Sequence, residues 1–136
     1  MRYLLRLLVA AGLAVDAYIH ADLAGRYNAI GTSFTQGDLF RIEAGVASFA
    51  ALLVIVWGGR VAYGLAFLVA ASALGAVVLY RYDNVGKLAF LPNMYEPRWF
   101  TEKAEAAIAE GVALAGALMA LGAVGVKRLH GAGALA

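Results

Sequence analysis

Four long apolar runs, separated by short polar segments, account for most of the sequence. They cover residues 3–23, 39–57, 61–80 and 104–126, and each has close to the roughly 20 residues that a helix needs to cross a bilayer. Backbone hydrogen bonds in lipid must be satisfied within the segment, so runs of this length predict helices rather than barrel strands. The pattern predicts an all-α fold: an integral membrane antiparallel four-helix bundle, formed as a single membrane domain over residues 1–136.

The first run has Arg2 and Arg6 at its start and could be mistaken for a signal peptide. It is longer than the apolar core of a signal peptide, and Asp16 interrupts it, so we interpret it as a membrane span. Between the second and third runs only Gly58, Gly59 and Arg60 remain. These two helices are therefore predicted to form a tight antiparallel hairpin.

Composition supports a membrane protein and narrows its chemistry. Hydrophobic residues make up 63% of the chain and charged residues only 15%, which is too little to cover a soluble domain. The absence of cysteine excludes disulfides and thiolate metal sites. The net charge of +2 is spread over several loops without a basic stripe, so nucleic acid is not an expected partner, whereas the lipid bilayer is.

The distribution of charge predicts the orientation. The end of the bundle that carries both termini and the short hairpin has five basic residues in very short segments and no acid: Arg2, Arg6, Arg60, Lys127 and Arg128. All nine acids lie toward the other end. Because basic residues in short loops have the greatest weight in the positive-inside rule, both termini are predicted to be cytoplasmic (N-in/C-in).

The outer connection between the third and fourth spans is predicted to be structured. It contains both prolines and a series of aromatic side chains, which favours packing onto the bundle. Its candidate contacts with a partner protein are Tyr95, Glu96, Arg98 and Trp99. In the other outer connection, Asp38 is predicted to cap the second helix.

Several ionisable residues fall within the apolar runs, where charge is unfavourable unless it is paired or functional. The candidate ligand- or ion-binding residues are Asp16, His20, Glu43, Glu105 and Glu110. The expected ion-pair partners are Arg41, Arg81 and Lys103. Two interpretations remain open: an outward-facing polar pocket, or, as we favour, a structural network that pairs the acids with these bases. A metal site needs three or four convergent ligands, and His20 is the only histidine placed to contribute, so neither a metal nor another cofactor is expected.

No phosphate-binding glycine loop, HExxH pair, nucleophile elbow or haem-type histidine pair occurs in the spans. The leading hypothesis is therefore a non-catalytic accessory or binding subunit that acts through its outer face, within a membrane protein complex or a homo-oligomer. One alternative is an ion- or proton-coupled transporter that uses the intramembrane acids. A further alternative is an intramembrane enzyme on a lipid or quinone, with His20 and a carboxylate as acid and base. It would require an apolar cavity that reaches His20 from the lipid.

Three segments carry a family resemblance: DAYIHADLAGRYN, GDLFRIEAG and LYRYDNVG…LPNMYEPRWFTEKAEA. They resemble small, uncharacterised four-helix membrane proteins of high-GC Gram-positive bacteria, over most of the chain. In architecture alone, the chain also resembles the DoxX-like group of compact four-helix membrane proteins. The resemblance implies a four-helix, multi-pass fold in a bacterial plasma membrane and no specific activity.

Overall fold

The structure, a computed structural model, describes the backbone of residues 2–135 and the side chains of residues 2–126 and 129. Within this part of the chain it contains no strand. The elements are α1 (Arg2–Leu23), the 3-10 helix η1 (Ala24–Tyr27), α2 (Gln36–Val56), α3 (Gly59–Tyr82) and α4 (Thr101–Leu135). The predicted all-helical fold is confirmed. The fourth helix, however, continues beyond the predicted end of its span at residue 126.

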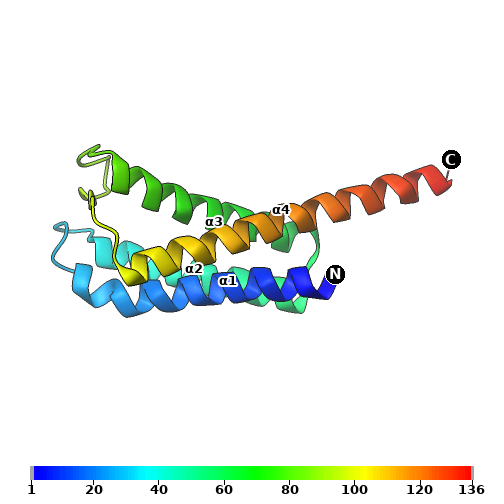
Figure 1. Cartoon of the computed structure of the whole chain (residues 1–136), viewed down its shortest axis with the longest axis horizontal. Coiled ribbons are helices and arrows are strands. Elements are labelled where there is room, and N and C mark those ends of the chain that lie inside the picture. Colours follow the sequence, from blue (N-terminus) through cyan, green and yellow to red (C-terminus); the bar gives the residue numbers. More distant parts are fainter. Residues whose placement is uncertain (1, 136) are drawn as a thin grey trace.

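The helices form an up-and-down bundle in which α1 packs between α2 and α4, and α3 completes the ring by contacting both. We call the end with the α2–α3 turn the hairpin end, and the end with the two long connections the loop end (Figure 1). Toward the loop end α3 diverges from α1 and α2, whereas α4 extends past the other helices in the opposite direction (Figure 1).

Each of the four α-helices is long and apolar enough to cross a membrane. Large apolar side chains also cover their outward surfaces: Leu52 is 63% exposed, Val61 81% and Ile108 68%. In water such surfaces would be unfavourable, because each would leave apolar area hydrated. These features together are those of a multi-pass membrane protein.

Glycine allows α1 and α4 to approach each other closely. A Cβ atom on Gly12 would lie 2.7 Å from the carbonyl oxygen of Ala109 and 3.1 Å from the Cβ of Ala113. One on Gly116 would lie 2.8 Å from a methyl group of Val9. Small residues in contact are a general means of bringing membrane helices together. This crossing fixes the position of the residues that follow Gly12 on α1.

The turn between α2 and α3 is as tight as predicted. The backbone N–H groups of Trp57 and Gly58 both donate to the carbonyl oxygen of Leu53, at 2.9 and 3.1 Å. Gly58 has φ +64°, a left-handed conformation that glycine adopts without steric strain. The guanidinium of Arg6 lies where a Cβ on Gly58 would be, so α1 also packs against this turn.

At the loop end, the cap of α2 differs from the prediction. Thr35 is the N-cap residue, and its hydroxyl accepts from the N–H of Asp38 at 3.1 Å. The Asp38 carboxylate accepts from the N–H of Thr35 at 3.0 Å, which completes a capping box. Asp38 therefore contributes to the cap, as predicted, but as the third residue of the helix paired with the N-cap residue Thr35.

The connection from α3 to α4 packs onto the bundle. The N–H of Glu96 donates to the carbonyl oxygen of Tyr80 at 2.9 Å, and the side chain of Met94 is only 6% exposed. Pro92 is also buried. The predicted structured loop is confirmed in this respect.

Candidate functional site

One face of α1 carries the first two groups of the site. Asp16 lies one turn beyond Gly12, and His20 lies one turn beyond Asp16, so all three share a face. Because Gly12 is held against α4, this face is directed into the bundle. Asp16 is fully buried, and His20 is 9% exposed.

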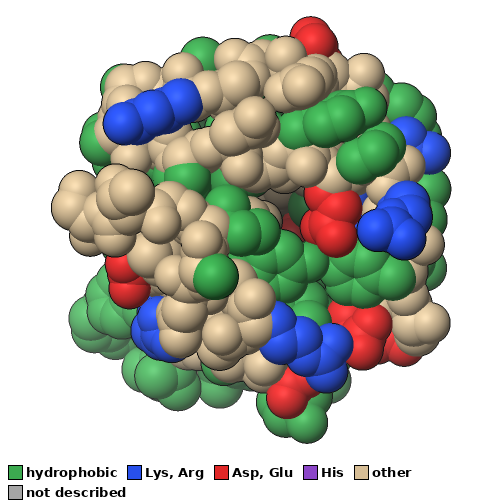
Figure 2. Space-filling view, turned by 90° about the vertical axis from the view of Figure 1, so that its left-hand side faces the viewer, with side chains coloured by type: hydrophobic (Ala, Val, Ile, Leu, Met, Phe, Trp, Pro, Cys, Tyr) green, Lys and Arg blue, Asp and Glu red, His purple; other side chains and the backbone are tan. Residues whose placement is uncertain are grey.

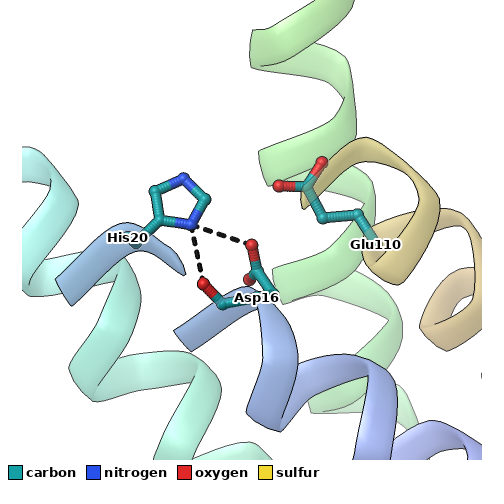
Figure 3. Close-up of side chains that lie close together, drawn as sticks. All are labelled: Asp16, His20 and Glu110. Atoms are coloured by element: carbon teal, nitrogen blue, oxygen red, sulfur yellow. Dashed lines mark hydrogen bonds and ion pairs between the residues drawn. The ribbon is translucent and has the colours of Figure 1, made fainter. Parts of the chain in front are cut away.

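His20 folds back onto Asp16 (Figure 3). Its Nδ1 lies 3.0 Å from the backbone carbonyl oxygen of Asp16 and 2.8 Å from the carboxylate Oδ1 of the same residue. A carbonyl oxygen can only accept, so Nδ1 carries a proton in this arrangement. The carbonyl contact has hydrogen-bond geometry, whereas the contact to Oδ1 is close but poorly directed.

Two more carboxyl groups meet Asp16 from other helices. Glu110 on α4 is 1% exposed and points toward Asp16 (Figure 3). Glu43 on α2 is the other acidic neighbour of Asp16. Both carboxylate oxygens of Asp16 and of Glu110, and one of Glu43, are buried without a well-directed hydrogen bond. We call Asp16, His20, Glu43 and Glu110 the acid/His cluster.

An apolar cavity of about 210 Å³ reaches this cluster from the loop end. It is bounded by α1, α2, α3, α4 and the connection before α4, and His20 and Glu43 form the polar part of its deeper end. Its apolar wall consists of Ile19, Leu23, Leu39, Phe40, Ala73, Ala76, Val77, Met94, Phe100 and Ala106. Figure 2, which views the loop end, shows a hollow surrounded by hydrophobic and acidic side chains.

Polar groups also line the cavity nearer the loops, and several of them hold the loops in place. The hydroxyl of Tyr27 donates to a carboxylate oxygen of Glu96 at 3.0 Å. The ammonium of Lys103 donates to the carbonyl oxygens of Glu96 and Arg98, at 2.7 and 3.2 Å. These bonds join η1, the connection and α4 around the opening.

The structure brings together four of the five predicted ligand- or ion-binding residues. Glu105 is the exception: its side chain is exposed on α4. The helical repeat of 3.6 residues places position 105 about 140° around the helix from position 110. Since Glu110 faces the bundle, Glu105 must face away from it.

The predicted ion-pair network is wrong. Arg41 pairs with Asp38 at 3.3 Å on the surface, and the ammonium of Lys103 is taken up by backbone carbonyls. The guanidinium of Arg81 lies over the rings of Tyr82 and Trp99, at 4.7 and 5.7 Å. Among the described residues, no lysine or arginine forms an ion pair with the acid/His cluster.

The proposed partner contacts divide into two groups. Tyr95 and Trp99 are 39% and 43% exposed, and Arg98 is exposed as well. Glu96 instead accepts from Tyr27 and lines the cavity. Sequence reasoning did not identify the cavity wall, although Phe40 and Val77 lie toward the loop ends of α2 and α3, and Phe100 immediately precedes α4.

No family model, curated protein or solved structure matches this chain. The site must therefore be interpreted from its own geometry.

Proposed function

We propose that this chain is a small integral membrane protein that binds a membrane-soluble molecule in its loop-end cavity, without catalysing a reaction itself. The observation that carries the proposal is an apolar cavity that ends at His20 and Glu43. Ligand sites in proteins have this character: mainly apolar walls with a few converging polar groups that orient the ligand.

The size of the cavity limits its occupant. Pockets for drug-sized molecules measure about 300–1,000 Å³, so 210 Å³ accommodates one ring or one head group. The remainder of a longer molecule would extend out of the cavity. An imidazole and a carboxyl group at the deep end suit a hydroxyl or carbonyl group on the ligand, as in a quinone ring or the polar end of a lipid.

The packing of the rest of the bundle supports binding over transport. Between the cluster and the hairpin end, the core consists of buried apolar side chains, of which Val9, Leu13 and Val54 have no exposed surface. A single chain therefore offers a cavity closed at its inner end. This arrangement favours a binding protein over a carrier that must open to both sides.

The proposal includes an orientation. With both termini in the cytoplasm of a bacterial cell, the cavity opens on the outer side of the plasma membrane, and the exposed Tyr95, Arg98 and Trp99 are available there to a partner protein. Because the chain has no cysteine, single cysteines can test this directly. A membrane-impermeant maleimide should label Asn93→Cys in intact cells, whereas Arg60→Cys should react only after lysis; the reverse pattern would refute the orientation.

Native mass spectrometry after gentle extraction from the membrane tests the binding itself. The wild-type chain should carry one small molecule. The test variant is Ala73→Phe, because Ala73 lines the cavity and is only 8% exposed. A phenyl ring there occupies the space of the ligand and should remove the bound mass.

The matched control is Ala115→Phe, the same substitution at an exposed position of α4, which should retain the ligand. A wild-type chain that carries no small molecule would refute the proposal. An Ala73→Phe variant that retains the bound molecule as fully as the control would also refute the proposal.

A further inference from the structure

Asp16, His20 and Glu110 offer three potential metal ligands at one place. One carboxylate oxygen from each acid and one ring nitrogen of His20 all lie within 4.8 Å of one another. They come from α1 and α4, whose spacing is fixed by the glycine contacts described above. The three side chains therefore converge on a rigid part of the bundle (Figure 3).

The burial of these groups is the second, independent observation. Asp16 is fully buried and Glu110 is 1% exposed. Oδ1 of Asp16 lies 2.8 Å from Nδ1 of His20, yet none of the four carboxylate oxygens has a well-directed hydrogen bond, and Glu110 has no ion-pair partner among the described residues. Buried polar atoms in proteins almost always have a partner, and an unpaired one calls for an explanation such as a bound ion. No lysine or arginine of the described chain supplies the positive charge.

We propose that Asp16, His20 and Glu110 bind a divalent transition-metal ion of the Mn²⁺, Fe²⁺ or Zn²⁺ class. Carboxylate oxygens suit Mn²⁺, and imidazole nitrogen suits Fe²⁺ and Zn²⁺, so the mixed donor set selects these ions over Ca²⁺. Donors that each stand about 2.0–2.2 Å from a metal are up to about 4.4 Å apart. The observed spacing of 4.8 Å or less therefore needs only small rotations of the side chains.

The ring nitrogen of His20 that faces Asp16 is Nδ1, which lies 2.8 Å from Oδ1 and 3.0 Å from the backbone carbonyl oxygen of that residue (Figure 3). As a metal ligand, Nδ1 would give up its proton and its bond to this carbonyl oxygen. Glu43, the other acidic neighbour of Asp16, lines the cavity next to the three ligands.

This site revises the expectation that the chain binds no metal. That expectation rested on the number of histidines, although Asp16, His20 and Glu110 were already candidates for a shared polar pocket. The inference does not depend on the proposed ligand of the cavity, because a metal can be measured with no other molecule present.

Titration with the metal alone provides the test. Purified protein in detergent is first stripped with EDTA and desalted. Mn²⁺ is then added while the six-line electron paramagnetic resonance signal of the free ion is recorded, and bound Zn²⁺ is quantified separately by elemental analysis. One ion per chain is expected. Asp16→Asn and Glu110→Gln should each weaken binding by at least about 100-fold, since removal of groups that only support a ligand already costs about 10–100-fold.

Glu105→Gln is the matched control, because Glu105 is on the same helix as Glu110 but exposed; its affinity should equal that of the wild type. Helicity by circular dichroism establishes that the variants are folded. If the variants do not fold, the wild-type protein alone tests the proposal. Zn²⁺ should then raise the unfolding midpoint of the wild type, and EDTA should reverse the increase. Absence of stoichiometric binding, an unchanged midpoint, or full affinity in Asp16→Asn and Glu110→Gln would overturn the proposal.

Discussion

The half of the bundle at the hairpin end (the hairpin half) and the half at the loop end (the loop half) differ in how completely their buried groups are packed and hydrogen-bonded. In the hairpin half, Val9, Leu13 and Val54 are buried with no exposed surface, and the α2–α3 turn satisfies its own backbone groups. In the loop half, α3 diverges, a cavity opens, and the buried carboxyl groups of Asp16 and Glu110 lack directed partners. Polar groups left in this way lower stability.

This difference indicates that the hairpin half stabilises the fold and the loop half holds the candidate site. A well-packed part of a protein can hold neighbouring side chains in energetically unfavourable positions. Such unfavourable local features are expected at functional sites. The hairpin half and the α1–α4 crossing at Gly12 hold the helices in register. The loop half can then keep unpaired acids and a cavity together.

Truncation in the hairpin half should have the largest effect. Leu13→Ala removes a fully buried side chain from the core and should lower the free energy of unfolding by about 2–5 kcal/mol, the range for leucine truncations in protein cores. Equilibrium unfolding in mixed SDS and mild detergent, followed by circular dichroism, measures the change. Leu52→Ala, at a position that is 63% exposed, is the control and should change stability by less than about 0.5 kcal/mol. Equal effects would mean that the core is not where the structure places it.

A larger side chain at the α1–α4 crossing should lower the free energy of unfolding nearly as much as truncation of the core does. A side chain at Gly12 would collide with the backbone of Ala109, so Gly12→Val should destabilise the protein by about 3 kcal/mol, near the upper end for overpacked sites. It should also weaken metal binding, because it moves Asp16 away from Glu110. Gly75→Val is the control, since nothing lies within 4 Å of a Cβ at Gly75. If both variants unfold alike, the close crossing is refuted.

The sequence predicted the helices well but the partners of their charged residues poorly. Long apolar runs can satisfy their backbone only as helices, so the spans follow from local information. The partners of Arg41, Arg81 and Lys103, in contrast, depend on which other acceptor groups lie within reach of each side chain in the folded protein. Arg41 has Asp38 one turn away, and Lys103 has the carbonyl oxygens of a loop whose path the sequence does not reveal.

The outward position of Glu105 could have been predicted from the sequence. Glu105 and Glu110 are five residues apart, which on a helix places them on different faces. The alanines at 106, 109, 113, 117 and 120, all buried, mark the face of α4 that packs inward, and Glu110 lies on it. The cavity was beyond prediction, because it depends on the divergence of α3 and on the packing of Met94 and Phe100 beneath the loop.

In the loop half, removal of a polar group should increase stability. Glu110→Met replaces a buried carboxyl group without directed partners by an apolar side chain of similar length. In the presence of EDTA, we expect a gain of about 1–2 kcal/mol in the free energy of unfolding, because the desolvation penalty of an unsatisfied polar group is removed. Glu105→Met, at an exposed position, should give no comparable gain. A clear loss of stability in Glu110→Met would show that Glu110 has a structural partner and would contradict the division between the halves.

The smallest effect on stability is expected from substitution of Arg41. This substitution distinguishes a surface pair of Arg41 with Asp38 from a pair of Arg41 with a buried acid. The structure pairs this residue with Asp38 on the surface, where both side chains are about half exposed, at 50% and 44%. Exposed ion pairs contribute little to stability, so Arg41→Ala should leave the unfolding midpoint unchanged within the error of the measurement. If Arg41 instead neutralised one of the buried acids, of which Glu43 is the nearest to it in the sequence, its removal would leave an uncompensated buried charge and lower the midpoint markedly. In that case Glu43→Gln should restore the midpoint in the double variant, whereas the structure predicts that Glu43→Gln has the same effect with or without Arg41.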